Sequence, residues 1–106
     1  MSSIKIGKDS NIETLINQTN ITVVKYGATW CGPCKMLAPV LEKLADEMGD
    51  VTFVDVDVDD DDAEMTVKSS EVSSVPLMVF YKNGQPVNRV LGFRPEEEIV
   101  RIIESL

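Results

Sequence analysis

Two repeats of apolar and polar positions run along the chain, and together they predict an α/β domain. Short runs rich in β-branched and aromatic residues indicate strands at 21–26, 51–58, 77–81 and 87–91. Apolar positions at helical spacing, or residues that start helices, indicate helices at 11–17, 37–48, 61–70 and from 95 onward. With a further strand ahead of the first helix, the order is strand–helix–strand–helix–strand–helix–strand–strand–helix. We therefore expect one domain over 1–106, in which helices cover both faces of a mixed sheet.

Individual residues predict where these elements begin and end. Ser10 has the hydroxyl side chain of an N-cap for the first helix, and Gly49 ends the second helix. Asn83-Gly84 is typical of a tight hairpin turn between the last two strands. Pro95 and the three glutamates after it predict the start of the last helix, where a fixed φ and negative charge are both favourable.

Composition narrows the chemistry that this domain can perform. Of 106 residues, 43% are hydrophobic and 26% are charged, which is ordinary for a folded domain. The net charge is −8, from 18 acidic and 10 basic residues, so nucleic acid, which needs a basic face, is not an expected partner. The chain has no histidine, the commonest acid–base group and metal ligand. Any reaction must therefore use thiols, carboxylates, lysines or backbone groups.

The beginning of the chain and its longest apolar run bear on location. The residues after Met1 include no apolar leader segment and no small-residue cleavage site. The longest apolar run, 75–81, is far shorter than the roughly 20 residues that a spanning helix needs. We therefore expect a cytoplasmic protein that does not enter membranes.

The only two cysteines, Cys31 and Cys34, lie three positions apart. Such a pair does not make the disulfide framework of a secreted mini-domain, and it supplies only half the ligands of a structural zinc site. A metal shared between two chains stays open, as does a passive role as two small buried side chains.

The position of the cysteines favours a redox function. A strand ends at Ala28 and a helix follows directly, so Cys31 falls at a helix start, where unpaired amides stabilise a thiolate. Cys34 lies one turn further on, close enough to form a disulfide. The pattern predicts a dithiol in which Cys31 attacks a disulfide and Cys34 resolves the mixed disulfide.

Several short motifs resemble the thioredoxin family. They are Trp30-Cys-Gly-Pro-Cys-Lys35, Val75-Pro76 before the fourth strand, Lys82-Asn-Gly84 in the turn and Gly92 after the fifth strand. The resemblance implies the thioredoxin fold, a five-stranded mixed sheet flanked by four helices, and a monomeric reductase of protein disulfides. It also implies that no cofactor or metal binds the chain and that a thioredoxin reductase recharges it.

The same resemblance implies a substrate surface around the dithiol. Pro76 would follow a cis peptide bond, and the backbone of Val75 would pair with an extended substrate segment. The whole apolar surface would comprise Trp30, Gly32, Pro33, Val75, Pro76 and Gly92. Apart from the resemblance, Val75 and Gly92 are better explained as an ordinary packing residue and a loop glycine.

The chain departs from the family at two positions on neighbouring strands. The resemblance implies a buried aspartate before the dithiol, which assists proton transfer at the resolving cysteine, and commonly a lysine on the next strand. Lys25 and Asp55 occupy these positions here, so the charges are exchanged. We expect Lys25 to pair with Asp55 or Asp57, which strand alternation sets opposite a row of valines. Alternatively, Lys25 extends to solvent beside Gly27, where the family usually has a tryptophan.

Three consequences of this exchange stay open. Asp55 could take the place of the family's carboxylate, or Lys25 could act as a base for Cys34. A fixed positive charge near the dithiol would also stabilise a thiolate and make the protein more oxidising. Lys25 and Asp55 are therefore candidate catalytic residues beside the two cysteines.

Six aspartates between 55 and 62 raise the question of a calcium loop. Loops that start at Asp55, Asp57 or Asp60 lack the glycine that such a loop needs at its sixth position. A solvated loop before a helix start explains the run better.

Two other functions are compatible with the sequence. One is a thioredoxin-fold subunit without activity that serves as a scaffold in a larger complex. The other keeps the chemistry but runs it in the opposite direction, as a dithiol oxidase or isomerase. An insulin-reduction assay tests the first alternative, and the reduction potential tests the second.

Overall fold

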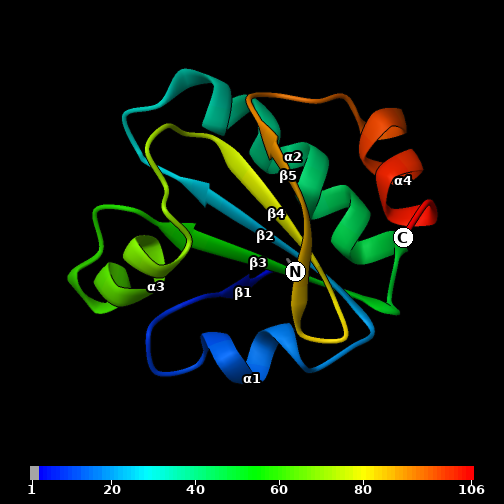
Figure 1. The fold of residues 1–106 in the computed structure, drawn as a ribbon. Coiled ribbons are helices and arrows are strands. Elements are labelled where there is room, and N and C mark those ends of the chain that lie inside the picture. Colours follow the sequence, from blue (N-terminus) through cyan, green and yellow to red (C-terminus); the bar gives the residue numbers. More distant parts are fainter. Residues whose placement is uncertain (1–2) are drawn as a thin grey trace.

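A computed structural model describes residues 3–106, which form a mixed sheet between helices (Figure 1). Met1, on which the expectation about a leader segment rests, lies outside the described residues. The strands are β1 (Lys5–Ile6), β2 (Ile21–Gly27), β3 (Val51–Asp57), β4 (Leu77–Lys82) and β5 (Gln85–Leu91). Their order across the sheet is β1-β3-β2-β4-β5. β1 and β2 run parallel to β3, whereas β4 is antiparallel to β2 and β5 is antiparallel to β4.

Four α-helices within residues 3–106 cover the two faces of this sheet. They are α1 (Ile12–Ile16), α2 (Gly32–Glu47), α3 (Glu64–Ser69) and α4 (Glu96–Glu104), and a short 3-10 helix, η1 (Asp61–Ala63), precedes α3. Helices α2 and α4 lie on one face, and α1 and α3 lie on the other (Figure 1). The predicted five-stranded mixed sheet with four flanking helices is confirmed.

Two apolar cores form because successive strand residues point to opposite sides of the sheet. Val23 packs among side chains of α2 and α4, whereas the next residue, Val24, packs on the face that α1 and α3 cover. β2 is the central strand, and all seven of its residues are buried. Lys25 is one of them. It lies two residues after Val23, so its side chain points to the same face of the sheet, and a charged group enters the middle of the molecule on the α2 side.

Several boundaries differ from the expected ones, among them the starts of α1, α2 and β5. α1 begins after Asn11 instead of Ser10, and the Asn11 Oδ1 accepts a hydrogen bond from the Lys8 amide (2.7 Å) instead of capping the helix. α2 begins at Gly32, ahead of its apolar pattern, because Cys31 is its N-cap residue and Cys34 lies in its first turn. β5 begins at Gln85, directly after the hairpin turn.

Candidate active site

The two cysteines lie at the start of α2, where the chain leaves the end of β2. Cys31 is the N-cap residue, with extended backbone angles, and Pro33 lies in the first helical turn. The Cys34 amide donates a hydrogen bond to the Cys31 Sγ at 3.2 Å. The sulfur of Cys31 therefore occupies the place that an N-cap oxygen usually takes, where helix amides stabilise negative charge.

Cys31 and Cys34 are joined by a disulfide, with their Cα atoms 5.3 Å apart. Both residues are buried, and Ala28 completes their small apolar cluster, against which Val58 and Val75 pack. The helix turn brings the two sulfurs into bonding position, so the pair can pass between dithiol and disulfide where it stands.

Three chain segments meet around this disulfide. The β2–α2 loop contributes Trp30, which is largely exposed and donates its Nε1 hydrogen to Asp59 Oδ2 at 2.8 Å. The segment before β4 contributes Val75 and Pro76, which are joined by a cis peptide bond. Gly92, just after β5, donates its amide hydrogen to the Pro76 carbonyl at 2.8 Å.

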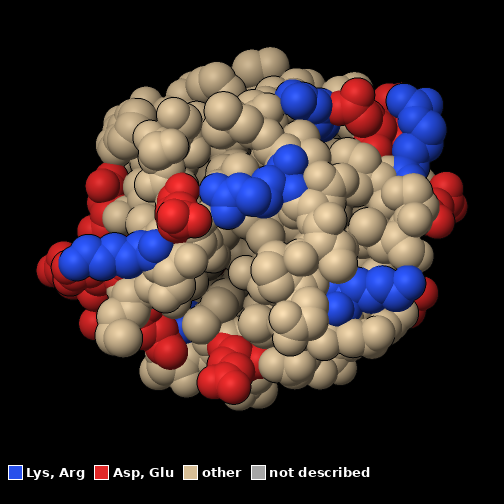
Figure 2. All heavy atoms as spheres, in the orientation of Figure 1, with Lys and Arg blue, Asp and Glu red and all other residues tan. Residues whose placement is uncertain are grey.

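Most residues predicted for the substrate surface are accessible at this end of the molecule. Gly32 and Pro33 are exposed beside Trp30, and Val75 and Gly92 are partly buried, whereas Pro76 is buried. In the view of Figure 2, the region over the β2–α2 loop and the segment before β4 is largely uncharged, and acidic side chains gather beside it, near α3.

Lys25 and Asp55 face each other across β2 and β3, where they are register partners. The Lys25 Nζ lies 3.6 Å from the Asp55 Oδ1, and the two side chains are 9% and 41% exposed. Asp57 is instead opposite Gly27, and its Oδ1 accepts a hydrogen bond from the Asp59 amide at 2.9 Å. Of the two expected partners for Lys25, the structure therefore selects Asp55.

Gly27 makes room for the lysine. A Cβ at this position would lie 2.9 Å from Lys25 Cε and 3.4 Å from Cys34 Sγ. The lysine side chain and the buried sulfur thus border the same small space, which a larger residue at 27 would fill.

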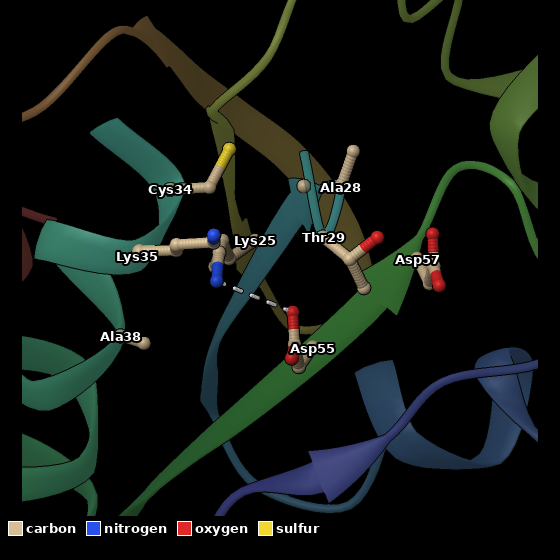
Figure 3. A pocket seen from close by; sticks show the side chains of 9 residues that line it. Lys25, Ala28, Thr29, Cys34, Lys35, Ala38, Asp55 and Asp57 are labelled. Carbon is tan, nitrogen blue, oxygen red and sulfur yellow. Dashed lines mark ion pairs between the residues drawn. The ribbon is translucent and has the colours of Figure 1, made fainter. Parts of the chain in front are cut away.

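A cavity of about 200 Å³ connects the ion pair with the dithiol. Its wall includes Lys25, Cys34 and Asp55, together with Lys35 of α2 and Asp57 (Figure 3). A second cavity, of about 220 Å³, shares Lys25 and Asp55 and extends along α2 and β1. The ammonium of Lys25 therefore lies between two cavities, and only the first of them reaches Cys34.

The acidic run is organised by hydrogen bonds within its own loop. Asp60 pairs with Lys8 at 2.6 Å, and its other carboxylate oxygen accepts from the Asp62 amide at 2.9 Å. The hydrogen bond from Lys8 lowers the pKa of Asp60. Within residues 3–106, no group of three or more acidic or cysteine side chains is arranged to hold a metal ion.

Sequence reasoning missed the partner of Trp30. Asp59 holds the indole, but in the sequence it was one of six similar aspartates. Its position just after a strand that runs parallel to β2 was the available signal, because the carboxyl ends of parallel strands lie at the same edge of a sheet.

A dithiol at a helix start, closed as a disulfide beside a cis Val–Pro bond, defines a class of protein. The chemistry available to it is exchange of its own dithiol with the disulfide of another molecule. The site is therefore that of a thiol–disulfide oxidoreductase.

Comparison with known proteins identifies the family. The thioredoxin family model matches residues 3–105. A thioredoxin of Staphylococcus saprophyticus is 43% identical over 106 residues, which is 99% of this chain and 98% of the relative, and one of Staphylococcus aureus is 38% identical with the same coverage. The chain belongs to the thioredoxin family, whose members are protein-disulfide oxidoreductases.

Solved structures agree with this assignment. A mutant thioredoxin from Halobacterium salinarum superposes with a TM-score of 0.87 at 29% identity, covering 99% of this chain and 93% of that one. Mitochondrial thioredoxin 3 from Saccharomyces cerevisiae, in its oxidized form, gives a TM-score of 0.85 at 35% identity and covers 98% and 96% of the two chains.

Within residues 3–106, none of the helices has the length and apolar character that a membrane span requires.

Proposed function

We propose that this protein supplies electrons to protein disulfides through Cys31 as the attacking thiol and Cys34 as the resolving thiol. The Cys31 thiolate attacks one substrate sulfur, and the other substrate sulfur leaves as a thiolate and takes up a proton. The Cys34 thiolate then attacks the Cys31 sulfur and releases the second substrate thiolate. Two electrons pass to the substrate, and the enzyme is left with the disulfide seen in this structure.

The observation that carries this assignment of roles is the position of the two sulfurs relative to α2. Cys31 is the N-cap residue, so the helix amides favour its thiolate, and the exposed residues Gly32 and Trp30 adjoin it in sequence. Cys34 is the more deeply buried of the two and borders the cavity that Lys25 and Asp55 also line. A substrate disulfide therefore meets Cys31 first.

The proposed substrate surface is built around this thiol. It comprises Trp30, Gly32, Pro33, Val75, Pro76 and Gly92. An extended substrate segment would add its backbone to that of Val75, an interaction that tolerates many side chains. The small number of charges in this region, seen in Figure 2, supports recognition by shape and apolar contact.

The proposal includes a partner and a location. A thioredoxin reductase would return electrons to the Cys31–Cys34 disulfide, and the protein would act as a monomer in the cytoplasm as part of cellular redox homeostasis. Family membership supports this role, and no bound cofactor or metal and no nucleic acid has a part in it.

Insulin reduction with dithiothreitol as electron source tests the assignment. We expect wild type to accelerate the reaction and Cys31→Ser to abolish the acceleration. Reduced Cys34→Ser, freed of dithiothreitol before insulin is added, should accumulate a mixed disulfide with the substrate, detectable by mass spectrometry. A wild-type protein without turnover would instead support the scaffold alternative.

The reduction potential tests the direction of the reaction. A value well above the cytosolic glutathione poise, about −220 to −320 mV, would contradict the reductase role and favour an oxidase or isomerase. Equilibration with glutathione buffers, followed by quantification of free thiols, measures it.

A further inference from the structure

We propose that Lys25 is a positioning residue for the resolving step, in which its ammonium stabilises the thiolate of Cys34 while Asp55 holds the ammonium in the cavity. This inference rests on the proposed role of Cys34 as the resolving thiol. It assigns to a cation the place where the family pattern has a carboxylate.

The ion pair with Asp55 is long, and Lys25 also lines the cavity that Cys34 borders. The Lys25 side chain is 9% exposed, and its distance of 3.6 Å to Asp55 exceeds the roughly 2.7–2.9 Å of a strong charge-assisted hydrogen bond. Within residues 3–106, the ammonium makes no hydrogen bond to a protein acceptor. A buried group with three donors is stabilised by further negative charge or by water in the cavity that it faces.

Lys25 and Cys34 also border one small space, beside Gly27. The Cε of the lysine and the Sγ of the cysteine both lie within 3.4 Å of the place that a Cβ of Gly27 would occupy. Figure 3 shows the lysine ending in the cavity between Cys34 and Asp55. A charge on the sulfur would therefore form beside the Lys25 side chain, in the wall of the cavity that both residues line.

The geometry favours Lys25 over Asp55 as the group that acts on Cys34. Asp55 is 41% exposed, and the atoms nearest to the space beside Gly27 belong to Lys25 and Cys34, not to Asp55. The role of the pair is then electrostatic: Lys25 offers a fixed positive charge, and Asp55 keeps it in place.

The resolving step then proceeds with balanced charge. The Cys34 thiol releases its proton to solvent through the cavity, which has room for water. The thiolate attacks the Cys31 sulfur, the bond from Cys31 to the substrate breaks, and the substrate sulfur leaves with the electron pair and takes up a proton. The positive charge of Lys25 compensates the negative charge while it resides on Cys34.

Other charged groups also line this cavity and must be separated from Lys25. Lys35 reaches into it from α2, and Asp55 and Asp57 border it from β3. The two carboxylates oppose formation of a thiolate, whereas the two lysines favour it. Lys25, and not the exposed Lys35, must therefore contribute most to the stability of the Cys34 thiolate.

A two-phase reaction of the reduced protein with a chromogenic aromatic disulfide, 5,5′-dithiobis(2-nitrobenzoate), tests the proposal by stopped-flow absorbance. The first phase reports attack by Cys31, and the second reports resolution by Cys34. In Lys25→Met and Lys25→Gln we expect the second phase to be about tenfold slower at pH 7, and its pH midpoint to rise by about one unit. The first phase should change much less, because Cys31 is stabilised by the helix start.

Two further variants test which charged residue of the cavity acts on Cys34. Lys35→Gln is the matched control, and a shift as large as that of Lys25→Gln would overturn the assignment to Lys25. Asp55→Asn removes the charge that holds the ammonium but leaves Lys25 itself, so its second phase should slow less than that of Lys25→Gln at pH 7. A slowing in Asp55→Asn larger than that in Lys25→Gln would identify Asp55 as a proton acceptor and overturn the proposal.

The outcomes also separate this inference from the proposed function. Loss of the first phase in wild type would contradict the roles of the cysteines. An unchanged second phase in folded Lys25→Met and Lys25→Gln would contradict the role of Lys25 alone. Thermal unfolding and far-ultraviolet circular dichroism identify any variant that has not folded.

Discussion

At the scale of single residues, the lysine and the aspartate on the two neighbouring central strands differ in environment. Lys25 lies inside the molecule, and Asp55 is close to half exposed. The sequence revealed the exchanged charges, but it could not give this difference, because both positions follow the same strand alternation. Lys25 lies on β2, the central strand, whereas Asp55 lies on β3, one strand nearer the edge of the sheet, and the lysine side chain is the more enclosed of the two.

This asymmetry predicts unequal effects of the two neutral substitutions on stability. Asp55→Asn leaves a buried ammonium without its partner and should lower the free energy of unfolding by about 1–3 kcal/mol. Lys25→Met leaves only an exposed carboxylate and adds an apolar side chain, so the free energy should be unchanged or higher by up to about 1 kcal/mol. Urea unfolding of both variants and wild type at pH 7 measures the difference. The interpretation would be wrong if Lys25→Met were the less stable of the two.

At the scale of elements, α3 depends on a residue far away in the sequence. Its own N-cap residue, Ala63, makes no side-chain cap. The Asp9 carboxylate instead accepts hydrogen bonds from the amides of Met65 and Thr66, at 3.2 and 2.7 Å, and from the Thr66 hydroxyl at 2.7 Å. The loop after β1 thus holds the start of α3 against the body of the molecule.

The cap predicts a dependence of stability on pH. The hydrogen bond from the Thr66 hydroxyl lowers the pKa of Asp9 below its ordinary value of 3.8. A depressed folded-state pKa stabilises the protein above the ordinary value, and this contribution is lost as the pH falls through the folded-state pKa. We therefore expect Asp9→Asn to lower the melting temperature at pH 7 and to approach wild type as the pH falls below the folded-state pKa of Asp9.

Calorimetry across this pH range, with Asp50→Asn as a matched control at an exposed position, measures the effect. A deficit in Asp9→Asn that stays constant with pH would show that the carboxylate charge is not what stabilises α3.

At the scale of the whole molecule, the proposed substrate surface exists only because three separate connections end at the same edge of the sheet. Trp30 belongs to the β2–α2 connection, Pro76 to the segment before β4, and Gly92 to the segment after β5. Trp30, the only tryptophan of the chain, is 69% exposed, and the Asp59 carboxylate holds its ring in place. An exposed, anchored aromatic ring is typical of a binding surface.

Trp30→Ala should therefore weaken the reaction with proteins while leaving the thiol chemistry intact. We expect kcat/KM for insulin to fall about tenfold, since truncation of a central aromatic contact commonly costs more than 1 kcal/mol. The rate with a small disulfide such as hydroxyethyl disulfide should stay nearly constant. Val87→Ala, at a 50% exposed position near the opposite end of β5, serves as control. Equal losses with both substrates would place the effect on the thiol and not on docking.

Much of the architecture could be predicted, because periodicity defined the strands and helices and the spacing of Cys31 and Cys34 matched a helix start. The long-range contacts could not, since they depend on which loops meet. Asp9 at α3 is one carboxylate in a polar segment. Asp59 at Trp30 is marked only by its place after a strand parallel to β2, which the other aspartates of the same run share. The cavity shared by Lys25 and Cys34 likewise depends on the packing of α2 against the sheet.

The small space beside Gly27 has a consequence for how this chain can change over generations. A larger residue at 27 would push the lysine from its present place, because a Cβ there would approach its Cε to 2.9 Å. A shorter residue at 25 would, in turn, leave that space unfilled. The two positions are therefore epistatic, so that the tolerance of each to mutation depends on the residue at the other. Replacement of Lys25 by a shorter acidic residue would therefore need a second change, at Gly27, to fill the space that the lysine leaves.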